Sequence, residues 1–291
     1  MNRIEASELI RNQDGSIYHL ALQPWQIADD IILVGDPGRV AEISGRFDKI
    51  DHKVINREFI THTGILNHKR LSVISTGIGT DNIDIVINEL DALVNIDLET
   101  RQKKKTHHQL NIIRLGTSGA LNATLEVDQF IISKYGMGID NLAHFYALDS
   151  MLLDEEATAA FLAHSHWSKK LSAPYFVKGS DILDRLFSDL IQRGITVTAP
   201  GFYGPQGRQL RIPMAIKNQN NRLASFSWKG YPVTNYEMET SALYALGQQL
   251  RHNTLTICAI IANREAGKYS KDHKQAVRRL IDEVLKTIAD K

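Results

Sequence analysis

Two glutamates stand close together in the run VTNYEMET at residues 233–240. Thr234 and Glu237 have the Ser/Thr-x-x-Glu spacing of a capping box, in which each side chain binds a backbone N–H of the other residue at the start of a helix. Glu239 lies beyond that box, where an acid can simply be a favourable charge at the positive end of the helix dipole. The run therefore predicts a helix over residues 237–250. Judged alone, it favours a structural role for both acids, and a chemical role requires partners elsewhere in the chain.

Arginines stand beside glycine-rich segments at two other places. Arg39 follows Gly35-Asp36-Pro37-Gly38, and Arg114 precedes Leu115-Gly116-Thr117. In both cases an apolar run comes first, so we predict a strand that runs into a glycine turn. Such turns offer free backbone N–H groups that hold anions at the carboxyl ends of strands. Either arginine alone is better explained by an ion pair with an acid, but the two together indicate a phosphate site.

Several familiar motifs are absent from the sequence. Gly77-Ile78-Gly79 lacks the third glycine of a dinucleotide fingerprint, because Asn82 occupies that position. There is no Walker sequence, no Gly-x-Ser-x-Gly elbow and no zinc-ligand cluster. His107-His108 has no further ligand at a metal-binding spacing. We therefore expect no organic cofactor and no bound zinc.

The composition is that of an ordinary globular protein, with 43% hydrophobic and 23% charged residues. The chain has 34 basic and 33 acidic residues and a net charge of +1, which argues against a protein that binds nucleic acid by neutralising its phosphates. Its single cysteine, Cys258, cannot form an internal disulfide. The first residues lack the apolar core of a signal peptide, and no apolar run is long enough to span a membrane. We expect a cytoplasmic protein with no nucleic-acid or membrane partner.

The elements that must position these residues alternate between strand and helix. Residues 31–34 form a short apolar run before the first glycine turn, and residues 81–94 have the spacing of an amphipathic helix. The β-rich runs 53–61 and 70–75 are predicted to form an antiparallel hairpin joined by residues 63–69. With no repeat, linker or composition break, the chain is predicted to be a single α/β domain over residues 1–291, built on a mixed sheet.

Taken together and in order, several segments resemble the uridine phosphorylases of the nucleoside phosphorylase superfamily. The segments are Tyr18-His19-Leu20, Gly35-Asp36-Pro37-Gly38-Arg39-Val40, Arg57-Glu58-Phe59, Ser75-Thr76-Gly77-Ile78-Gly79, Arg114-Leu115-Gly116-Thr117-Ser118-Gly119, Phe202-Tyr203-Gly204-Pro205-Gln206-Gly207-Arg208 and Asn235-Tyr236-Glu237-Met238-Glu239. Each segment alone is a weak signal. Together they are specific for the superfamily, and the Gln-x-Arg element favours its uridine branch.

The resemblance implies a three-layer α/β/α fold and a pentosyltransferase of nucleoside salvage in pyrimidine metabolism. Such an enzyme cleaves uridine, and related pyrimidine nucleosides, reversibly to uracil and ribose 1-phosphate. Inorganic phosphate is its co-substrate.

The resemblance also implies a role for individual residues. Phosphate would be bound by Gly35, Arg39, Arg57, Arg114 and Thr117. Ribose would be bound by His19, Thr117, Met238 and Glu239, while Glu237 mainly caps the helix. The base would be bound by Phe202, Gln206, Arg208 and Ile261. The residues expected to carry catalysis are Arg114, Gln206, Arg208 and Glu239.

Two of these residues, His19 and Arg57, would reach the site from a neighbouring subunit. This implies a homodimer as the minimal unit, with a hexamer built as a trimer of dimers as the larger alternative. The segments 97–109 and 138–172 are longer than in compact bacterial relatives, so the choice between dimer and hexamer stays open.

The sequence departs from the family pattern at three further places. Gly204-Pro205 inverts the usual Pro-Gly order, which leaves the pose of the base loop open. Some relatives bind a monovalent cation between subunits at positions that match Glu58, Ile78 and Asn82, but Asn82 replaces a serine there, so K+ binding is left open. Asn263-Arg264 stands where purine-cleaving relatives have Ser-Asp, which counts against a purine nucleoside as substrate.

Three alternative functions stay open. A nucleosidase of the same fold would use water and cleave uridine without phosphate. A purine nucleoside phosphorylase would prefer inosine or adenosine. A non-catalytic nucleoside-binding protein would be stabilised by uridine without releasing uracil. The tolerance for thymidine or deoxyuridine is also undetermined by the sequence.

Overall fold

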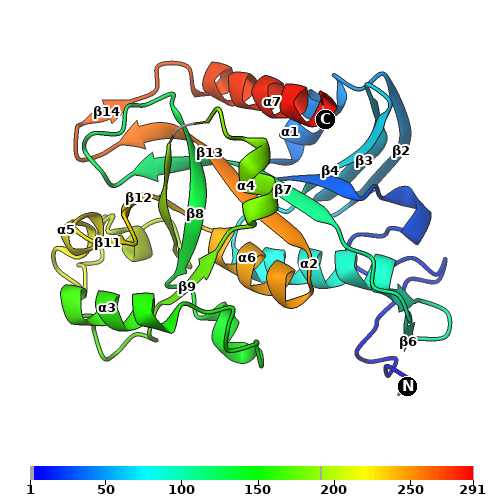
Figure 1. The fold of residues 1–291 in the computed structure, drawn as a ribbon, viewed down its shortest axis with the longest axis horizontal. Helices are drawn as coiled ribbons and strands as arrows, with labels where there is room; N and C mark the ends of the chain where they lie inside the picture. Colours follow the sequence, from blue (N-terminus) through cyan, green and yellow to red (C-terminus); the bar gives the residue numbers. More distant parts are fainter. Residues whose placement is uncertain (1–2, 191, 291) are drawn as a thin grey trace.

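A mixed β-sheet with helices on both faces runs through the computed structural model, which describes residues 3–190 and 192–290 (Figure 1). The strands of this sheet are β1 (Asp30–Val34), β2 (Lys49–Asn56), β3 (Phe59–Leu66), β4 (Lys69–Ser75), β7 (Asn111–Ala120), β8 (Phe130–Gly138), β9 (Tyr175–Lys178), β10 (Arg193–Thr198), β11 (Ser227–Trp228), β12 (Tyr231–Glu237), β13 (Asn253–Asn263) and β14 (Lys268–Tyr269). The α-helices are α1 (Pro37–Ser44), α2 (Thr80–Asn95), α3 (Glu155–Ser165), α4 (Asp181–Leu186), α5 (Gln219–Ala224), α6 (Thr240–Gln249) and α7 (His273–Ala289).

The strands follow the order β11-β12-β10-β8-β13-β7-β1-β4-β3-β2 across the sheet. The neighbouring pairs β4–β1, β1–β7 and β7–β13 are parallel, whereas the pairs β2–β3, β3–β4 and β8–β13 are antiparallel. The mixed sheet expected from the sequence is therefore confirmed.

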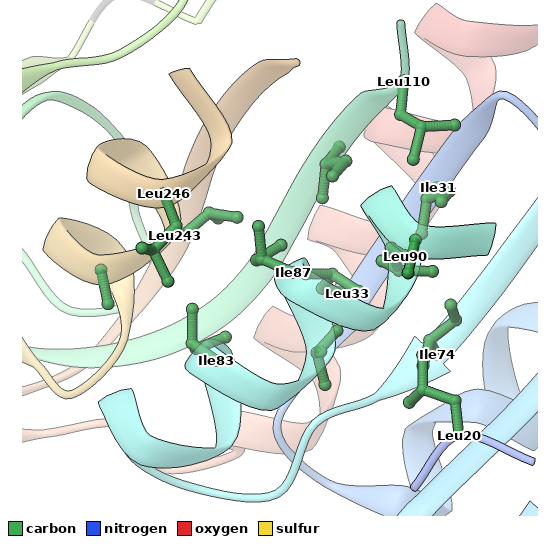
Figure 2. Close-up of a cluster of buried hydrophobic side chains, with 14 of the residues drawn as sticks. Leu20, Ile31, Leu33, Ile74, Ile83, Ile87, Leu90, Leu110, Leu243 and Leu246 are labelled. Carbon is green, nitrogen blue, oxygen red and sulfur yellow. The ribbon is translucent and has the colours of Figure 1, made fainter. Parts of the chain in front are cut away.

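Alternate residues of β1 divide the core between the two faces of the sheet, because successive side chains of a strand point to opposite sides. Ile31 and Leu33 pack with apolar residues of α2 and α6, including Ile87 and Leu243 (Figure 2). Ile32 and Val34 pack instead with residues of α1, α4 and α7 on the other face. Burial of β1 on both faces is typical of a parallel strand in a three-layer α/β/α arrangement.

Part of the sheet closes on itself. Strand β12 pairs with β10, and its end also pairs antiparallel with the end of β7 at Asn235–Ala120 and Tyr236–Gly119. Because β10, β8, β13 and β7 are consecutive neighbours, these strands and β12 form a closed circle. The closure brings the end of β12 beside β7, although the two strands are far apart in sequence.

The predicted hairpin over residues 53–75 is wrong in its boundaries. Three antiparallel strands occupy this region, and β3 runs through most of the predicted connection. The turn between β3 and β4 is only Asn67-His68, with φ values of 48° and 67°. Two residues with positive φ match the twist of a tight hairpin, and asparagine tolerates this conformation better than most side chains. The antiparallel pairing of β3 with β4 is as predicted.

The predicted capping box is also wrong. Thr234 lies inside β12, and its Oγ1 donates to the Ile195 carbonyl at 3.1 Å. The helix begins at Thr240 rather than at 237. β12 has a neighbour on each side, β10 and either β11 or β7, so ladder hydrogen bonds and burial override the local capping pattern.

The polar segment 97–109 is mostly exposed, as predicted, and carries a small hairpin of β5 (Ile96–Asp97) with β6 (Gln102–Lys103). The irregular segment 138–172 contains α3 and a 3-10 turn, η2 (Leu142–Phe145). None of the helices among the described residues is both long and apolar enough to cross a membrane.

Candidate active site

A cavity of about 1280 Å³ opens beside the carboxyl ends of β1 and β4. The glycine turns that follow these strands form one wall of the cavity, and the middle of β7 forms its floor. The loop at residues 202–208, the segment after β12 and the end of β13 complete the lining. The cavity thus draws on segments from almost the full length of the chain.

Most of the predicted site residues line this cavity. They are Gly35, Arg39, Arg114, Thr117, Phe202, Gln206, Arg208, Met238, Glu239 and Ile261. His19 and Arg57 do not line it. The individual roles assigned to these residues stay predictions.

Arg114 lies at the centre of the site and is almost fully buried. The prediction that it stands just before a glycine turn is wrong, because β7 continues through Gly116 to Ala120. Its Nη2 pairs with Glu239 Oε2, and its Nη1 lies 3.5 Å from Glu237 Oε2. Burial alone would lower the pKa of Arg114, but the two carboxylates outweigh that effect and raise it. Its Nε is buried without a hydrogen-bond partner among the described residues.

Gly116 is required by the position of the Arg114 guanidinium. A Cβ atom added at Gly116 would lie 2.2 Å from Arg114 Nη1 and 3.0 Å from Cys258 Sγ. Both neighbours are buried, so a side chain at this position would force the guanidinium or the thiol to shift. The absence of a side chain at this strand position lets the guanidinium lie across the backbone.

We predict that Gly116→Ala will displace Arg114. It should lower the turnover of the expected reaction, cleavage of uridine by phosphate, by roughly tenfold or more, because a misplaced charged donor stabilises the transition state less. Steady-state kinetics with purified protein measure this effect. Gly230→Ala is the matched control, since a Cβ there meets nothing within 4 Å although its φ of 84° introduces backbone strain. Equal turnover in the Gly116→Ala variant and the unmodified protein would contradict the prediction.

The two glutamates after β12 have different environments. Glu239 Oε1 accepts a hydrogen bond from the Gly79 N–H at 2.9 Å, and its other oxygen meets Arg114. Glu237 Oε2 accepts from the N–H groups of Glu239 and Thr240 at 2.8 and 2.9 Å, so it does satisfy the first amides of α6. Thr198 Oγ1 donates to Glu237 Oε1 at 2.6 Å. Sequence reasoning missed the contributions of Gly79 and Thr198, which depend on strands that meet only in the folded chain.

The Glu237 carboxyl is poised to titrate near neutrality. Burial raises its pKa from 4.5 to about 7, although Arg114 opposes the shift. The folded protein therefore binds a proton at Glu237 more tightly than the unfolded chain does. By linkage, the contribution of Glu237 to the free energy of unfolding is fully present below pH 4.5 and is lost as the pH rises to about 7.

We predict that Glu237→Gln will remove this loss, because the amide keeps the shape of the carboxyl but does not titrate. Urea unfolding at a pH of about 5 and of about 8 measures the free energy of unfolding of both proteins. The unmodified protein should lose more stability over this interval than the variant. Parallel losses in the two proteins would show that Glu237 does not titrate in this range.

The phosphate end of the predicted site is cationic. Arg39 Nη1 donates to the Leu115 carbonyl at 3.3 Å. Burial lowers the pKa of Arg39; Asp36 opposes this shift, and the nearby Arg114 adds to it. The repulsion between the buried Arg114 and the partly buried Arg39 would be relieved by an anion between them. The turn after β1 lies close to the turn after β4, since a Cβ at Gly35 would lie 3.3 Å from the Gly77 carbonyl oxygen.

The 202–208 loop holds its polar residues in a defined arrangement. Arg208 Nη1 donates to Gln206 Oε1 at 2.5 Å and to the Phe202 carbonyl at 2.7 Å, and its guanidinium lies 3.8 Å over the Phe202 ring. Arg264 donates to the Gln206 and Gly207 carbonyls at 2.8 and 3.0 Å. Sequence reasoning treated Arg264 only as a departure from the purine-cleaving pattern and missed this tether. Gly204-Pro205, the inverted pair, begins the 3-10 turn η3 (Gly204–Gln206).

His19 and Arg57 lie close to each other beside Tyr18 and do not line the cavity, although Glu58, next to Arg57 in the chain, does. His19 Nδ1 is 2.7 Å from Glu89 Oε1, and the Arg57 guanidinium lies 5.7 Å over the ring of Tyr18. Arg57 sits in the two-residue turn between β2 and β3 with φ of 54°. Within one chain, these two residues are therefore not brought to the other site residues.

The positions of the predicted cation site also meet at the cavity. Glu58, Ile78 and Asn82 all line it, and Asn82 Nδ2 donates to Glu58 Oε1 at 3.3 Å. In this arrangement the amide presents a donor to the carboxylate, whereas a K+ ion needs oxygen atoms around it. Within one chain these three residues do not surround a point with oxygen atoms, and K+ binding stays open.

A model of the phosphorylase superfamily matches residues 29–290 of the chain. Among curated relatives, a uridine phosphorylase from Thermococcus kodakarensis is 28% identical over 295 residues, which cover 100% of this chain and 93% of the relative. A purine nucleoside phosphorylase of the DeoD type from Clostridium perfringens is 28% identical over 247 residues, which cover 83% of this chain and 85% of the relative.

Among solved structures, a nucleoside phosphorylase from Trypanosoma brucei that shows uridine phosphorylase activity is similar over 97% of this chain and 100% of its own. Its TM-score is 0.86 and its sequence identity is 29%. The similarity therefore spans nearly all the segments that line the cavity.

Proposed function

The chain belongs to the phosphorylase superfamily, and we propose that it is a uridine phosphorylase. It transfers the ribosyl group of uridine to inorganic phosphate and yields uracil and ribose 1-phosphate. One observation supports this function above others: a single cavity joins two arginines, a carboxylate and a loop with a glutamine and an arginine. These groups suit phosphate, ribose and a pyrimidine, in that order.

The phosphate site is built from Arg39, Arg114, Thr117 and the backbone of Gly35. In phosphorolysis a phosphate oxygen forms a bond to C1′ while the C1′–N1 bond breaks. The electron pair of the broken C1′–N1 bond leaves with the uracil. No covalent intermediate with the protein is needed. The protein must hold the phosphate close to C1′ and complement its charge, which is orientation combined with electrostatic preorganisation.

The sugar and the base meet the other groups of the cavity. Glu239 accepts hydrogen bonds from ribose hydroxyls, beside the Met238 backbone, and its negative charge stabilises the positive ribosyl group of the transition state. At the base, Gln206 Oε1 is occupied by Arg208, which leaves the Gln206 amide N–H groups to donate to a uracil carbonyl. Arg208 supplies positive charge where the departing uracil becomes anionic.

Uracil release from uridine, measured with and without inorganic phosphate, tests the proposal. We expect release only with phosphate, together with an equal amount of ribose 1-phosphate. Inosine, thymidine and deoxyuridine are the substrate controls. Release without phosphate would identify a nucleosidase, preferred cleavage of inosine a purine nucleoside phosphorylase, and uridine binding without cleavage a binding protein.

We further propose that the active unit is at least a homodimer in which His19 and Arg57 complete the partner's site. Both residues were assigned to the substrates by resemblance, yet neither lines the cavity of its own chain. They lie near each other on one side of the subunit, close to the turn between β2 and β3. A two-fold axis near this turn would carry both residues into a second copy of the cavity.

Mixed dimers measure this sharing directly. Arg57→Ala and Arg208→Ala should each be nearly inactive alone, because each removes a residue from both sites of a dimer. After the two variants are unfolded and refolded together, random pairing leaves about a quarter of all sites intact, each with Arg208 from one chain and Arg57 from the other. Recovery of about a quarter of the activity is expected, whereas no recovery would place Arg57 outside the partner's site.

A further inference from the structure

A second cavity, of about 620 Å³, lies behind the 202–208 loop. Gly204 and Pro205 line only this second cavity, whereas Phe202 and Gln206 line only the first. Arg208 lines both. The loop is therefore the wall that separates the two cavities.

The walls of the second cavity are largely apolar. Trp167 and Leu171 contribute from the segment after α3, and Ile212, Pro213 and Ile216 contribute from the segment between the 202–208 loop and α5. Ile212 is 83% exposed. Exposed apolar side chains are normally isolated on a protein surface, whereas Ile212 belongs to the apolar group that lines this cavity. The volume is in the range of sites that hold small organic molecules.

One cationic group at this cavity is unpaired. Arg211 lines the cavity, is exposed, and has no ion pair or hydrogen-bond partner among residues 3–190 and 192–290. No acidic residue is among those that line the cavity. Arg208, the other cation there, is already engaged by Phe202 and Gln206. An apolar cavity with a free guanidinium complements a molecule with an apolar body and one anionic group.

We propose that the second cavity is a binding site for a small amphipathic anion, such as an aromatic or aliphatic carboxylate or sulfonate. The cavity and the charge of Arg211 assign the ligand class, and neither is used by the reaction. A molecule held there contacts the back of the loop that carries Gln206 and Arg208.

The contacts of the 202–208 loop give this site a route to the nucleoside cavity. Gln219, which also lines the second cavity, donates from Nε2 to the Pro205 carbonyl at 2.6 Å and to Tyr236 OH at 3.1 Å. A ligand against Pro205 and Gln219 shifts or stiffens the loop, and so changes the affinity for uridine. By linkage, uridine then changes the affinity for the ligand by the same factor. This coupling rests on the proposed function, whereas the binding site itself does not.

Two fluorescent probes with the same apolar body test the site: anilinonaphthalene sulfonate, which is anionic, and phenylnaphthylamine, which is uncharged. Arg211→Gln should weaken binding of the sulfonate about tenfold and leave the uncharged probe unchanged. Ala215→Trp, which places a large side chain in the cavity lining, should weaken both probes about tenfold. Lys217→Gln is the matched control, since it removes one exposed positive charge from the same segment outside the lining and should change neither.

Titrations with saturating uridine and no phosphate separate the two cavities. We expect the sulfonate to stay bound, with an altered affinity. Full displacement by uridine, or equal binding by all three variants, would overturn the proposal, because the probe would then occupy the first cavity or the general surface. A change of oligomeric mass in Ala215→Trp would also overturn it, because a second copy of the chain would then cover this face. The variant titrations need no turnover, so they decide the site even if uridine is not the substrate.

Discussion

Arg114→Ala should lower turnover of uridine by about a hundredfold or more, because it removes a preorganised cation from the place where we propose that phosphate approaches C1′. It should also lower the free energy of unfolding by about 3–5 kcal/mol, since it leaves the buried carboxylates of Glu237 and Glu239 without their partner. Steady-state kinetics and urea unfolding measure the two effects separately.

A second substitution distinguishes lost catalysis from lost folding. Glu239→Gln in the Arg114→Ala background removes one of the two stranded charges and should restore part of the stability. The double variant is compared with Glu239→Gln alone, which also lacks the ribose carboxylate but keeps Arg114. We expect the KM for phosphate to rise only where Arg114 is absent. An unchanged KM for phosphate, or near-normal turnover in folded Arg114→Ala, would remove Arg114 from the phosphate site.

Arg208→Ala should lower turnover by roughly a hundredfold or more, because no other side chain of the 202–208 loop carries positive charge toward the departing base. Stability should change little, since Arg208 is only half-buried and its contacts lie within its own loop. Arg208→Lys should recover only part of the activity, because lysine keeps the charge but lacks the planar guanidinium that lies over Phe202.

The leaving group provides a sharper test of the same role. Fluorine on the uracil ring stabilises the uracil anion, so the fluorinated nucleoside depends less on Arg208. We therefore expect Arg208→Ala to reduce cleavage of fluorinated uridine less than cleavage of uridine. Arg222→Ala, at a residue of α5 outside both cavities, is the control and should affect both substrates equally. Equal losses for the two substrates in Arg208→Ala would show that this residue holds the base without stabilising its charge.

The sequence determined the class of fold and most of the predicted residues that line the first cavity. The apolar run of β1, followed by Gly35 and a helix, could be predicted from the sequence. Hydrophobic periodicity and turn-forming residues act over only a few neighbouring positions, so a short stretch of sequence contains the whole signal. Ordered segments around Arg39, Arg114, Gln206 and Glu239 likewise indicated a cavity for phosphate, sugar and base. The structure places these four residues in one cavity.

Errors arose where local patterns competed with strand pairing. Thr234 and Glu237 have the spacing of a capping box, but β12 is held by its neighbouring strands, and α6 begins only at Thr240. Arg114 resembled a residue before a glycine turn, but Gly116 lies inside β7, where it makes room for the guanidinium. Sequence spacing contains no information on which strand will become the neighbour of another.

Only the tertiary structure decided that Glu237 and Glu239 form ion pairs with Arg114. Closure of the sheet through β12 and β7 brings Glu237 and Glu239 against Arg114, and Gly79 from the turn after β4 supplies an N–H to Glu239. The second cavity likewise exists only because distant segments fold behind the 202–208 loop. Residue types and local turns are properties of short stretches of chain, whereas burial, ion pairing and cavities depend on contacts between stretches far apart in sequence.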